Sequence, residues 1–297
     1  MTGEHFVVHG AWALAAAVSR KVRVEVEASH ALSVSSDRFS RGDQSALRPA
    51  AEVVRHLAKE HSFDPALRVS ISSGIPEGSG LGSSAATTVA VAAAVSRLKS
   101  LRLGVRQLVE ASMVGEKLIH GRPSGVDSNI CARGGVLLFR PGSRPKRVVP
   151  APGFSLIISN SGTVRNTGRL VGRVSVARDR NPGFFDGLAR TASGVSLLAS
   201  ERLASGDRKG LGLLLSFNQS MLSAVGASTS RLDRLVALAL SLGAHGAKLT
   251  GAGGGGCVLS VAPEGKEKRI ISGLRARGND TFRSAVPIGG VRTWLSR

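Results

Sequence analysis

The first half of the chain shows two kinds of hydrophobic pattern, one that repeats every second residue and one with helical spacing. Residues 20–29 (RKVRVEVEAS) alternate apolar and charged side chains, and residues 67–71 alternate in the same way, so both stretches predict strands. Residues 47–62 and 105–119 have apolar positions at helical spacing and predict helices. A third predicted helix, residues 85–98, consists largely of small and apolar residues, which indicates a buried position.

The second half begins with a predicted strand over residues 136–140. Residues 140–154 (RPGSRPKRVVPAPGF) are rich in proline, glycine and basic residues, and they predict a linker or domain boundary. The elements expected after it are a strand over 155–159, helices around 185–204, 208–226 and 230–242, a strand–glycine loop–strand over 247–261, and a closing helix and strand. Because strands and helices are mixed without regular alternation, we predict an α+β fold in two layers, with domains at residues 1–150 and 151–297.

The composition argues against a membrane or secreted protein. The longest apolar stretches, residues 11–18 and 89–95, are much shorter than the roughly 18 residues that span a bilayer. Glu4 and His5 occupy the place where a secretory signal would carry basic residues. The two cysteines are far apart and match no metal or redox spacing. We therefore expect a reduced, cytoplasmic protein that does not bind membranes.

The charge balance is strongly basic. Forty basic residues stand against 20 acidic ones, which gives a net charge of +20 and raises the expectation of a polyanionic partner. However, the chain has no tyrosine and few aromatic residues, so it lacks the stacking surfaces that single-stranded nucleic acids need. We expect the ligand to be a small phosphate compound, and nucleic-acid binding to be unlikely.

The first stretch with chemical potential is PEGSGLGSSAATT. Gly78, Gly80 and Gly82 let backbone N–H groups approach a ligand closely, and Ser83 and Ser84 stand at the start of a predicted helix, where phosphate binds favourably. The stretch is neither a Walker A motif nor a G-x-G-x-x-G motif. An N-terminal helix cap after a flexible turn remains an equally good interpretation.

The second stretch, GEKLIHGRPSGVDSN, runs from a predicted helix into a loop. A phosphotransferase needs one carboxylate to orient or deprotonate the attacking hydroxyl and another to hold Mg²⁺. Asp127 suits the first task because it lies in a predicted turn beside Gly125, and Glu116 on the helix suits the second. Each residue also has an ordinary structural interpretation, since aspartate commonly forms turns, and glutamate or histidine (here Glu116 and His120) commonly lies on a helix surface or caps it.

The third stretch, GAKLTGAGGGGCVLSV, has six glycines within the eleven residues 246–256. A hairpin needs fewer glycines than this, and four consecutive glycines lose much conformational entropy on folding. We therefore favour close approach of the backbone to a bulky anion over a plain turn.

The fourth stretch, SNSGTVRNTGRLV, follows a predicted strand. Arg165 could bind a carboxylate through two parallel hydrogen bonds. In a chain so rich in arginine, an ordinary surface position is the alternative.

Taken together and in this order, these stretches resemble the motifs of the GHMP kinases, small-molecule kinases of galactose, homoserine, mevalonate and phosphomevalonate. GSGLGSSAA is similar to the phosphate loop of that family, and KLTGAGGGGC is similar to its third motif. Within the family, GEHFVVHG, IHGRPSGVDSN and VRNTGRLV resemble the mevalonate kinases most. The resemblance extends along most of the chain. It implies an N-terminal domain like the second domain of ribosomal protein S5 and a ferredoxin-like C-terminal domain.

The resemblance also implies the ligands ATP, Mg²⁺ and mevalonate, with phosphoryl transfer to the C5 hydroxyl as a step of isoprenoid biosynthesis. Asp127 would be the general base, and Mg²⁺ would be bound by Glu116 and Ser84. The residues implied for the ATP phosphates are Gly78, Ser79, Gly80, Leu81, Gly82, Ser83, Ser84 and Ala85. The residues implied for the substrate are Glu4, His5, Arg165, Thr167, Gly251, Ala252 and Gly253. A homodimer is a further expectation.

The sequence departs from the family at its start. Members carry a strand of the type P-x-K-V-I-L before GEH, and its lysine lies near the catalytic aspartate. No such lysine precedes Glu4 here, and Lys21 comes after the motif. We expect that the start codon has been placed too late; the alternatives are that another cation such as Arg122 takes the role, or that the protein is catalytically impaired.

Two other functions remain open from the sequence. One is a kinase of the same family for another small alcohol, such as phosphomevalonate or homoserine. The other is a non-catalytic protein that has this fold and binds a polyanion through its positive charge.

Overall fold

The computed structural model describes residues 1–38, 44–76, 78–163, 174, 176, 178–286 and 288–295. Its internal contacts divide the chain into two compact units. Unit 1 comprises Met1–Ser19, Glu77–Leu81 and Gly135–Ile288, and unit 2 comprises Arg20–Pro76, Gly82–Gly134 and Gly289–Arg297. The chain therefore passes between the units several times. This division by contacts is distinct from the division into domains near residue 150, which stays a prediction.

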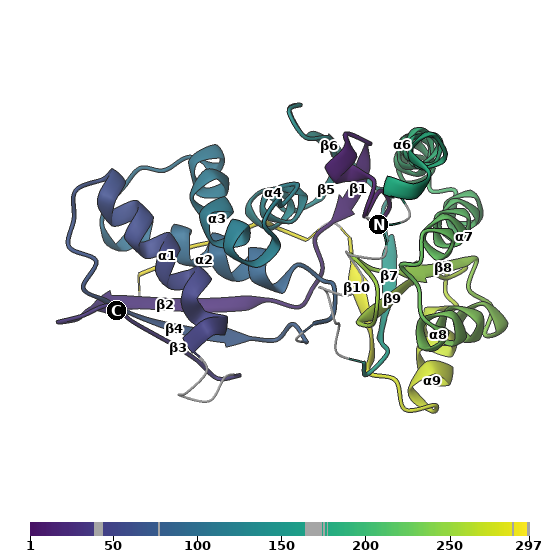
Figure 1. Cartoon of the computed structure of the whole chain (residues 1–297). Coiled ribbons are helices and arrows are strands. Elements are labelled where there is room, and N and C mark those ends of the chain that lie inside the picture. The colour runs from purple at the N-terminus through teal and green to yellow at the C-terminus, as the bar shows by residue number, and fades with distance from the viewer. Residues whose placement is uncertain are drawn as a thin grey trace. The chain divides into compact units, whose positions relative to one another are not determined.

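Unit 2 consists of a three-stranded sheet covered on one face by helices (Figure 1). The strand order is β2-β4-β3, with β2 antiparallel and β3 parallel to β4. The strands are β2 (Val22–Ala28), β3 (Ser33–Ser36) and β4 (Leu67–Ser73), and the helices are α1 (Gln44–Glu60), α2 (Ser83–Leu98), α3 (Val105–His120) and α4 (Val126–Arg133). In β2 the apolar residues are partly buried and alternate with exposed charged residues, as the period of two predicts.

The helices of unit 2 pack unusually closely around one glycine. A Cβ atom at Gly115 of α3 would lie 2.8 Å from the carbonyl oxygen of Pro49 in α1 and 2.7 Å from a methyl group of Thr88 in α2. Small residues such as Ala92 and Ala93 on α2 are buried in the same core. This close packing fixes the position of the next residue of α3, which is Glu116.

Unit 1 contains two antiparallel sheets, several helices and a short 3₁₀ helix, η1 (Val7–His9). The four-stranded sheet has the order β10-β7-β9-β8 and the three-stranded sheet has the order β1-β5-β6. The strands are β1 (Ala13–Ala16), β5 (Val136–Phe139), β6 (Lys146–Val148), β7 (Ser155–Asn160), β8 (Gly246–Leu249), β9 (Cys257–Val261) and β10 (Thr281–Ala285). The helices are α6 (Pro182–Ser205), α7 (Arg208–Ala224), α8 (Ser230–Ser241) and α9 (Glu267–Arg275).

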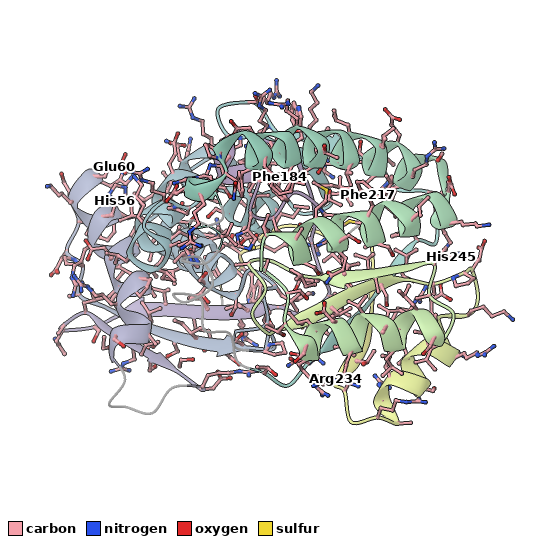
Figure 2. The ribbon with its side chains drawn as sticks, turned by 45° about the vertical axis from the view of Figure 1, so that its right-hand side comes forward. His56, Glu60, Phe184, Phe217, Arg234 and His245 are labelled. Carbon is pink, nitrogen blue, oxygen red and sulfur yellow. The ribbon has the colours of Figure 1, made fainter. Side chains whose placement is uncertain are left out.

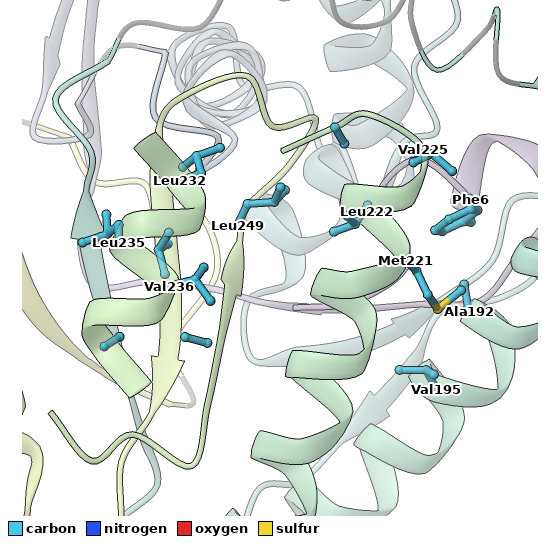
Figure 3. Packing of buried hydrophobic residues seen from close by; sticks show 14 of the residues in the cluster. Phe6, Ala192, Val195, Met221, Leu222, Val225, Leu232, Leu235, Val236 and Leu249 are labelled. Atoms are coloured by element: carbon cyan, nitrogen blue, oxygen red, sulfur yellow. The ribbon is translucent and has the colours of Figure 1, made fainter. Parts of the chain in front are cut away.

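The N-terminal segment of unit 1 is part of its core. Phe6 is fully buried in the same cluster as Met221, Leu222 and Leu249 (Figure 3). Its ring also lies beside that of Phe185, with 5.5 Å between the ring centroids. Burial of an aromatic side chain is a large apolar contribution to stability, so the residues around Phe6 are held in place by the core.

Most predicted elements are confirmed, within a few residues at their ends, and the mixture of sheets and helices confirms the α+β class. Residues 140–154, predicted as a linker or domain boundary, contain strand β6, which pairs with β5, and their role as a boundary stays a prediction. One interpretation is wrong, because Asp127 lies in the first turn of helix α4 rather than in a turn of a loop. Strands β1 and β3 have no counterpart in the sequence prediction. In the described part of the chain, no helix has the length and apolar character that crossing a membrane requires.

Candidate functional site

The start of helix α2 in unit 2 offers backbone donors to a ligand. The residue before the helix, Gly82, has a φ of +68° and provides no side chain to cap the first N–H groups of Ser83, Ser84 and Ala85. The side chain of Thr87 folds back to donate to the carbonyl oxygen of Ser83, at 3.0 Å, and so does not block the helix start. This end of the helix therefore has the backbone donors and the partial positive charge that favour phosphate.

The residues just before it, 78–81, belong to unit 1 and are anchored to its four-stranded sheet. The carbonyl oxygen of Ser79 accepts hydrogen bonds from the N–H of Cys257 (2.9 Å) and the hydroxyl of Thr250 (3.2 Å). Gly80 has a φ of +74°, and a Cβ atom there would lie 2.7 Å from the Thr250 carbonyl oxygen. The glycine at 80 is thus required by the protein's own backbone.

A pair of carboxylates lies beside the start of α2 within unit 2. Glu116 of α3 is only 3% exposed, whereas Asp127 of α4 is exposed. Burial raises the pKa of Glu116 to about 7; a hydrogen bond from the Ser84 hydroxyl opposes this, and the negative charge of Asp127 adds to it. A Cβ atom on Gly82 would lie 3.4 Å from the carboxyl carbon of Asp127. Ser84, Glu116 and Asp127 are therefore brought together, as the sequence analysis expects.

The Glu116 carboxylate has unused capacity to bind a cation. Its Oε1 atom is buried and has no hydrogen-bond partner among the described residues, and Oε2 lies 3.7 Å from Nε2 of His120. Among the described residues, no group of three or more histidine, cysteine or acidic side chains is arranged so that it could hold a metal ion by itself. Mg²⁺ commonly binds through one or two carboxylates together with substrate phosphates. Glu116 and Ser84 therefore fit a Mg²⁺ that is shared with a bound nucleotide.

Asp127 is positioned by a helix start. The residue before α4, Gly125, has a φ of +84°, which favours glycine, and Asp127 lies in the first turn, where the helix dipole favours a negative charge. One turn later, the pKa of the Cys131 thiol is raised by burial and further by Asp127 and Glu116. An exposed carboxylate beside a buried one gives the two groups different chemical roles.

In unit 1, the structure brings together three residues that the sequence analysis expects to contact substrate. The ring nitrogen Nε2 of His5 donates to the carbonyl oxygen of Ala252, at 2.7 Å. Glu4, next to His5, forms an ion pair with Lys248 of β8. Burial tends to raise the pKa of Glu4, but the Lys248 ammonium group, the α-amino group of Met1 and hydrogen bonding together keep that pKa below its ordinary value. Lys248 was given no role from the sequence, although it stands between apolar residues in a predicted strand.

The glycine loop at 251–256 packs against backbone from three other segments of unit 1. A Cβ atom at Gly253 would lie 2.0 Å from the carbonyl oxygen of Ala227. A Cβ atom at Gly255 would lie 2.6 Å from that of Thr163, and one at Gly256 would lie 2.6 Å from that of Ser79. Such distances exclude any side chain. Close packing of protein backbone therefore accounts for three of the glycines that the sequence analysis assigns to an anion.

Some predicted residues do not contribute to the geometry described. Arg165 and Thr167 lie outside the described residues. Arg122, the suggested replacement for the family lysine, is exposed.

A separate cavity of about 220 Å³ in unit 1 contains none of the predicted residues. Its lining includes Arg234, which is at the surface on α8 (Figure 2). This cavity is lined by residues of α8 and by Arg277 and Asn279 after α9, and it has no carboxylate in its lining, so it does not resemble a phosphoryl-transfer site.

Comparisons with known proteins agree with these motifs. Residues 48–135 match the GHMP kinases N terminal domain, and residues 199–280 match the GHMP kinases C terminal domain. Mevalonate kinase of Aeropyrum pernix is 34% identical over 98% of this chain and 94% of its own length, and that of Thermococcus sibiricus is 32% identical over the same shares. The crystal structure of L. major mevalonate kinase in complex with R-mevalonate has a TM-score of 0.82, with 28% identity over 97% of this chain and 93% of that one.

Proposed function

The chain belongs to the GHMP kinases, and we propose that it transfers the terminal phosphoryl group of ATP to the C5 hydroxyl of mevalonate. The products are 5-phosphomevalonate and ADP. The observation that carries this proposal is the arrangement of Ser84, Glu116 and Asp127 beside the start of helix α2. Phosphoryl transfer depends mainly on positioning and on neutralising charge, and this arrangement supplies both.

Each of the three residues has a distinct proposed role. Asp127 is exposed and stands in a helix start, and it accepts the proton of the attacking hydroxyl. Glu116 and Ser84 hold Mg²⁺, which supplies positive charge to the phosphate oxygens. The buried, unpartnered Oε1 of Glu116 supports this role, because a divalent cation satisfies it and favours the ionised carboxylate.

The ATP phosphates are proposed to bind at the glycine-rich loop, residues 78–82, and at the first turn of α2. The φ of +68° at Gly82 and the absence of a side-chain cap leave the first N–H groups of α2 directed toward a ligand. Ser79 and Gly80 are fixed by hydrogen bonding and close packing to the sheet of unit 1, which supports a preformed loop. A preformed loop binds phosphate with little loss of conformational freedom.

The choice of mevalonate as substrate rests on the relatives. Two archaeal proteins with at least 32% identity over 98% of this chain are named mevalonate kinase, and the L. major enzyme has R-mevalonate bound. Our proposal for the substrate-binding residues is Glu4, His5, Arg165, Thr167, Gly251, Ala252 and Gly253. Arg165 is assigned to the carboxylate of mevalonate because guanidinium binds carboxylate in a bidentate manner.

A coupled assay of ADP release tests the proposal. The purified protein is supplied with ATP, MgCl₂ and, in separate reactions, mevalonate, phosphomevalonate, homoserine or galactose. We expect kcat/KM for mevalonate to exceed that for each other alcohol by at least about 100-fold, because a site built to bind a particular set of polar groups strongly rejects analogues that lack them. Preference for another alcohol would assign a different member of the family, and ADP release with none of them would leave only a binding function.

Two further expectations remain predictions. A homodimer would cover large apolar side chains, and Phe184 of α6 and Phe217 of α7 are 64% and 52% exposed (Figure 2). Sedimentation velocity over a tenfold range of concentration measures this directly. The cytoplasmic location is supported by two cysteines that are both free thiols, Cys131 and Cys257, and fractionation of the native cells tests it.

A further inference from the structure

Lys248 is a fully buried charged residue that opens the KLTGAGGGGC stretch, and the sequence analysis gives it no role. It lies in β8, all four residues of which are buried, and its side chain has an exposed fraction of 0%. A lysine is almost never fully buried unless it is paired, because removing an ammonium group from water costs several kcal/mol. The environment of this residue therefore calls for a specific explanation.

The ammonium group of Lys248 is held by two acceptors. One is Oε1 of Glu4, and the other is the carbonyl oxygen of Leu249, at 2.6 Å. The second carboxylate oxygen of Glu4, Oε2, is buried and has no hydrogen-bond partner among the described residues. Lys248 therefore binds one oxygen of Glu4, and the other oxygen is left as an acceptor for a donor from outside the protein.

The chain around Glu4 is fixed on both sides. Thr2 forms a β-bridge with Leu14, and its hydroxyl donates to the Ser196 side chain at 2.8 Å. After Glu4, His5 donates to Ala252 of the glycine loop, and Phe6 is buried in the core. Lys248 thus adds a charged contact to a segment that is also held by backbone pairing, the hydrogen bond of His5 and apolar packing.

We propose that Lys248 is a positioning residue for substrate binding, which holds Glu4 with Oε2 directed to accept a hydroxyl of the alcohol substrate and thereby keeps the segment of Glu4 and His5 in its binding conformation. This inference rests on the proposed function, since it takes Glu4 and His5 as part of the substrate site. Stability alone is a weak explanation of the pair. Buried ion pairs can often be replaced by apolar residues with little loss of stability, so a role in positioning better accounts for the charge.

The proposal predicts a pH dependence that a purely structural role does not. The charged groups that act on Glu4 are the Lys248 ammonium and the α-amino group of Met1. Without Lys248, the burial of Glu4 is opposed less, and the pKa of Glu4 rises above its value in the parent. In Lys248→Met, kcat/KM for the alcohol should therefore reach its plateau at a higher pH than in the parent, because only the ionised Glu4 accepts the hydroxyl.

The experiment compares four proteins in the ADP-release assay: the parent, Lys248→Met, the double variant Glu4→Gln/Lys248→Met, and Arg234→Met. Arg234 is a surface residue of α8 and serves as the control for loss of a positive charge. At pH 7 we expect Lys248→Met to lose about 100-fold in kcat/KM for mevalonate, since small displacements of binding groups cost factors of this size, and to change KM for ATP less than threefold. The double variant should be folded, because no unpaired charge is left, and should show the same loss without the pH dependence.

The outcomes separate this inference from the proposed function. If the parent phosphorylates mevalonate and Lys248→Met stays within threefold of it with the same pH profile, Lys248 has no positioning role. If Lys248→Met does not fold, the double variant is compared with the parent instead. Activity of the double variant equal to that of the parent would overturn the inference. If the parent prefers phosphomevalonate, homoserine or galactose, the proposed function is wrong and the same comparison is made with that alcohol. If it uses none of the four, both proposals are overturned.

Discussion

Replacement of Glu116 by glutamine is expected to stabilise the protein at neutral pH while it removes kinase activity. Burial and the neighbouring Asp127 raise the pKa of Glu116 from 4.5 to about 7. Because the folded protein holds this proton more tightly than the unfolded chain, the contribution of Glu116 to stability is greatest below pH 4.5 and is lost as the pH rises toward 7. A shift of this size corresponds to about 3 kcal/mol, and the residue is nearly inaccessible to solvent, so little of it is screened.

Glutamine removes the free-energy cost of ionising a buried carboxylate, because it is neutral at every pH. It can still accept the hydrogen bond of the Ser84 hydroxyl. We therefore expect Glu116→Gln to increase the free energy of unfolding by up to about 3 kcal/mol at pH 8 and to leave it nearly unchanged at pH 4.5. Activity should fall by about 100-fold or more, because the proposed Mg²⁺ ligand has lost its charge.

Urea unfolding at pH 4.5, 6 and 8, in the absence of Mg²⁺ and nucleotide, measures the stability, and the ADP-release assay measures the activity. Glu110→Gln is a matched control, since Glu110 lies on the same helix with a side chain that is 57% exposed and paired with Arg106. A surface ion pair contributes little to stability, so this control should change the free energy of unfolding by less than about 1 kcal/mol at each of the three pH values. Equal effects of the two substitutions at pH 8, or loss of stability in Glu116→Gln, would refute the reasoning.

Three further predictions concern the rest of the site. Asp127→Asn should lower turnover by at least about 100-fold while nucleotide binding, measured by calorimetry, is retained; turnover within threefold of the parent would exclude Asp127 as the base. Gly256→Ala should cost at least about 2 kcal/mol more than Gly153→Ala in urea unfolding, because both glycines have positive φ but only Gly256 faces a carbonyl oxygen, that of Ser79, at 2.6 Å; equal costs would show that the loop simply moves aside. Cys131 should react with iodoacetamide at pH 8 more slowly in the folded protein than in urea, since burial and the two carboxylates raise its pKa, and equal rates would contradict this.

The sequence predicts those elements whose signal is local. The alternation over residues 22–28 and the helical spacing over residues 105–119 each arise within one element, and the structure contains both. Strands β1 and β6 were missed because they are short and lie in segments rich in small residues or in proline and glycine. Their pairing with β5 is what makes them strands, and such pairing is not encoded in the local pattern.

The same distinction applies to the site. The proximity of Glu116 and Asp127 could be predicted, because the two residues are only eleven positions apart and lie on either side of a predicted helix end. The contact between Glu4 and Lys248 joins residues 244 positions apart, and only the folded core brings them together. Burial of Glu116 was equally hidden, since a glutamate on a helix is usually exposed and its pKa depends on packing around Gly115.

The two glycine-rich stretches are best understood as one structure. The sequence suggests that each loop has its glycines so that backbone can approach an anion. However, Cys257 donates to Ser79, and Gly256 has no room for a side chain because the Ser79 carbonyl lies against it. Gly80 is in turn confined by Thr250 at the end of β8. The second glycine stretch therefore supports the first, and a substitution in residues 253–256 should weaken phosphate binding indirectly, through the position of Ser79, even where the altered residue does not contact the nucleotide.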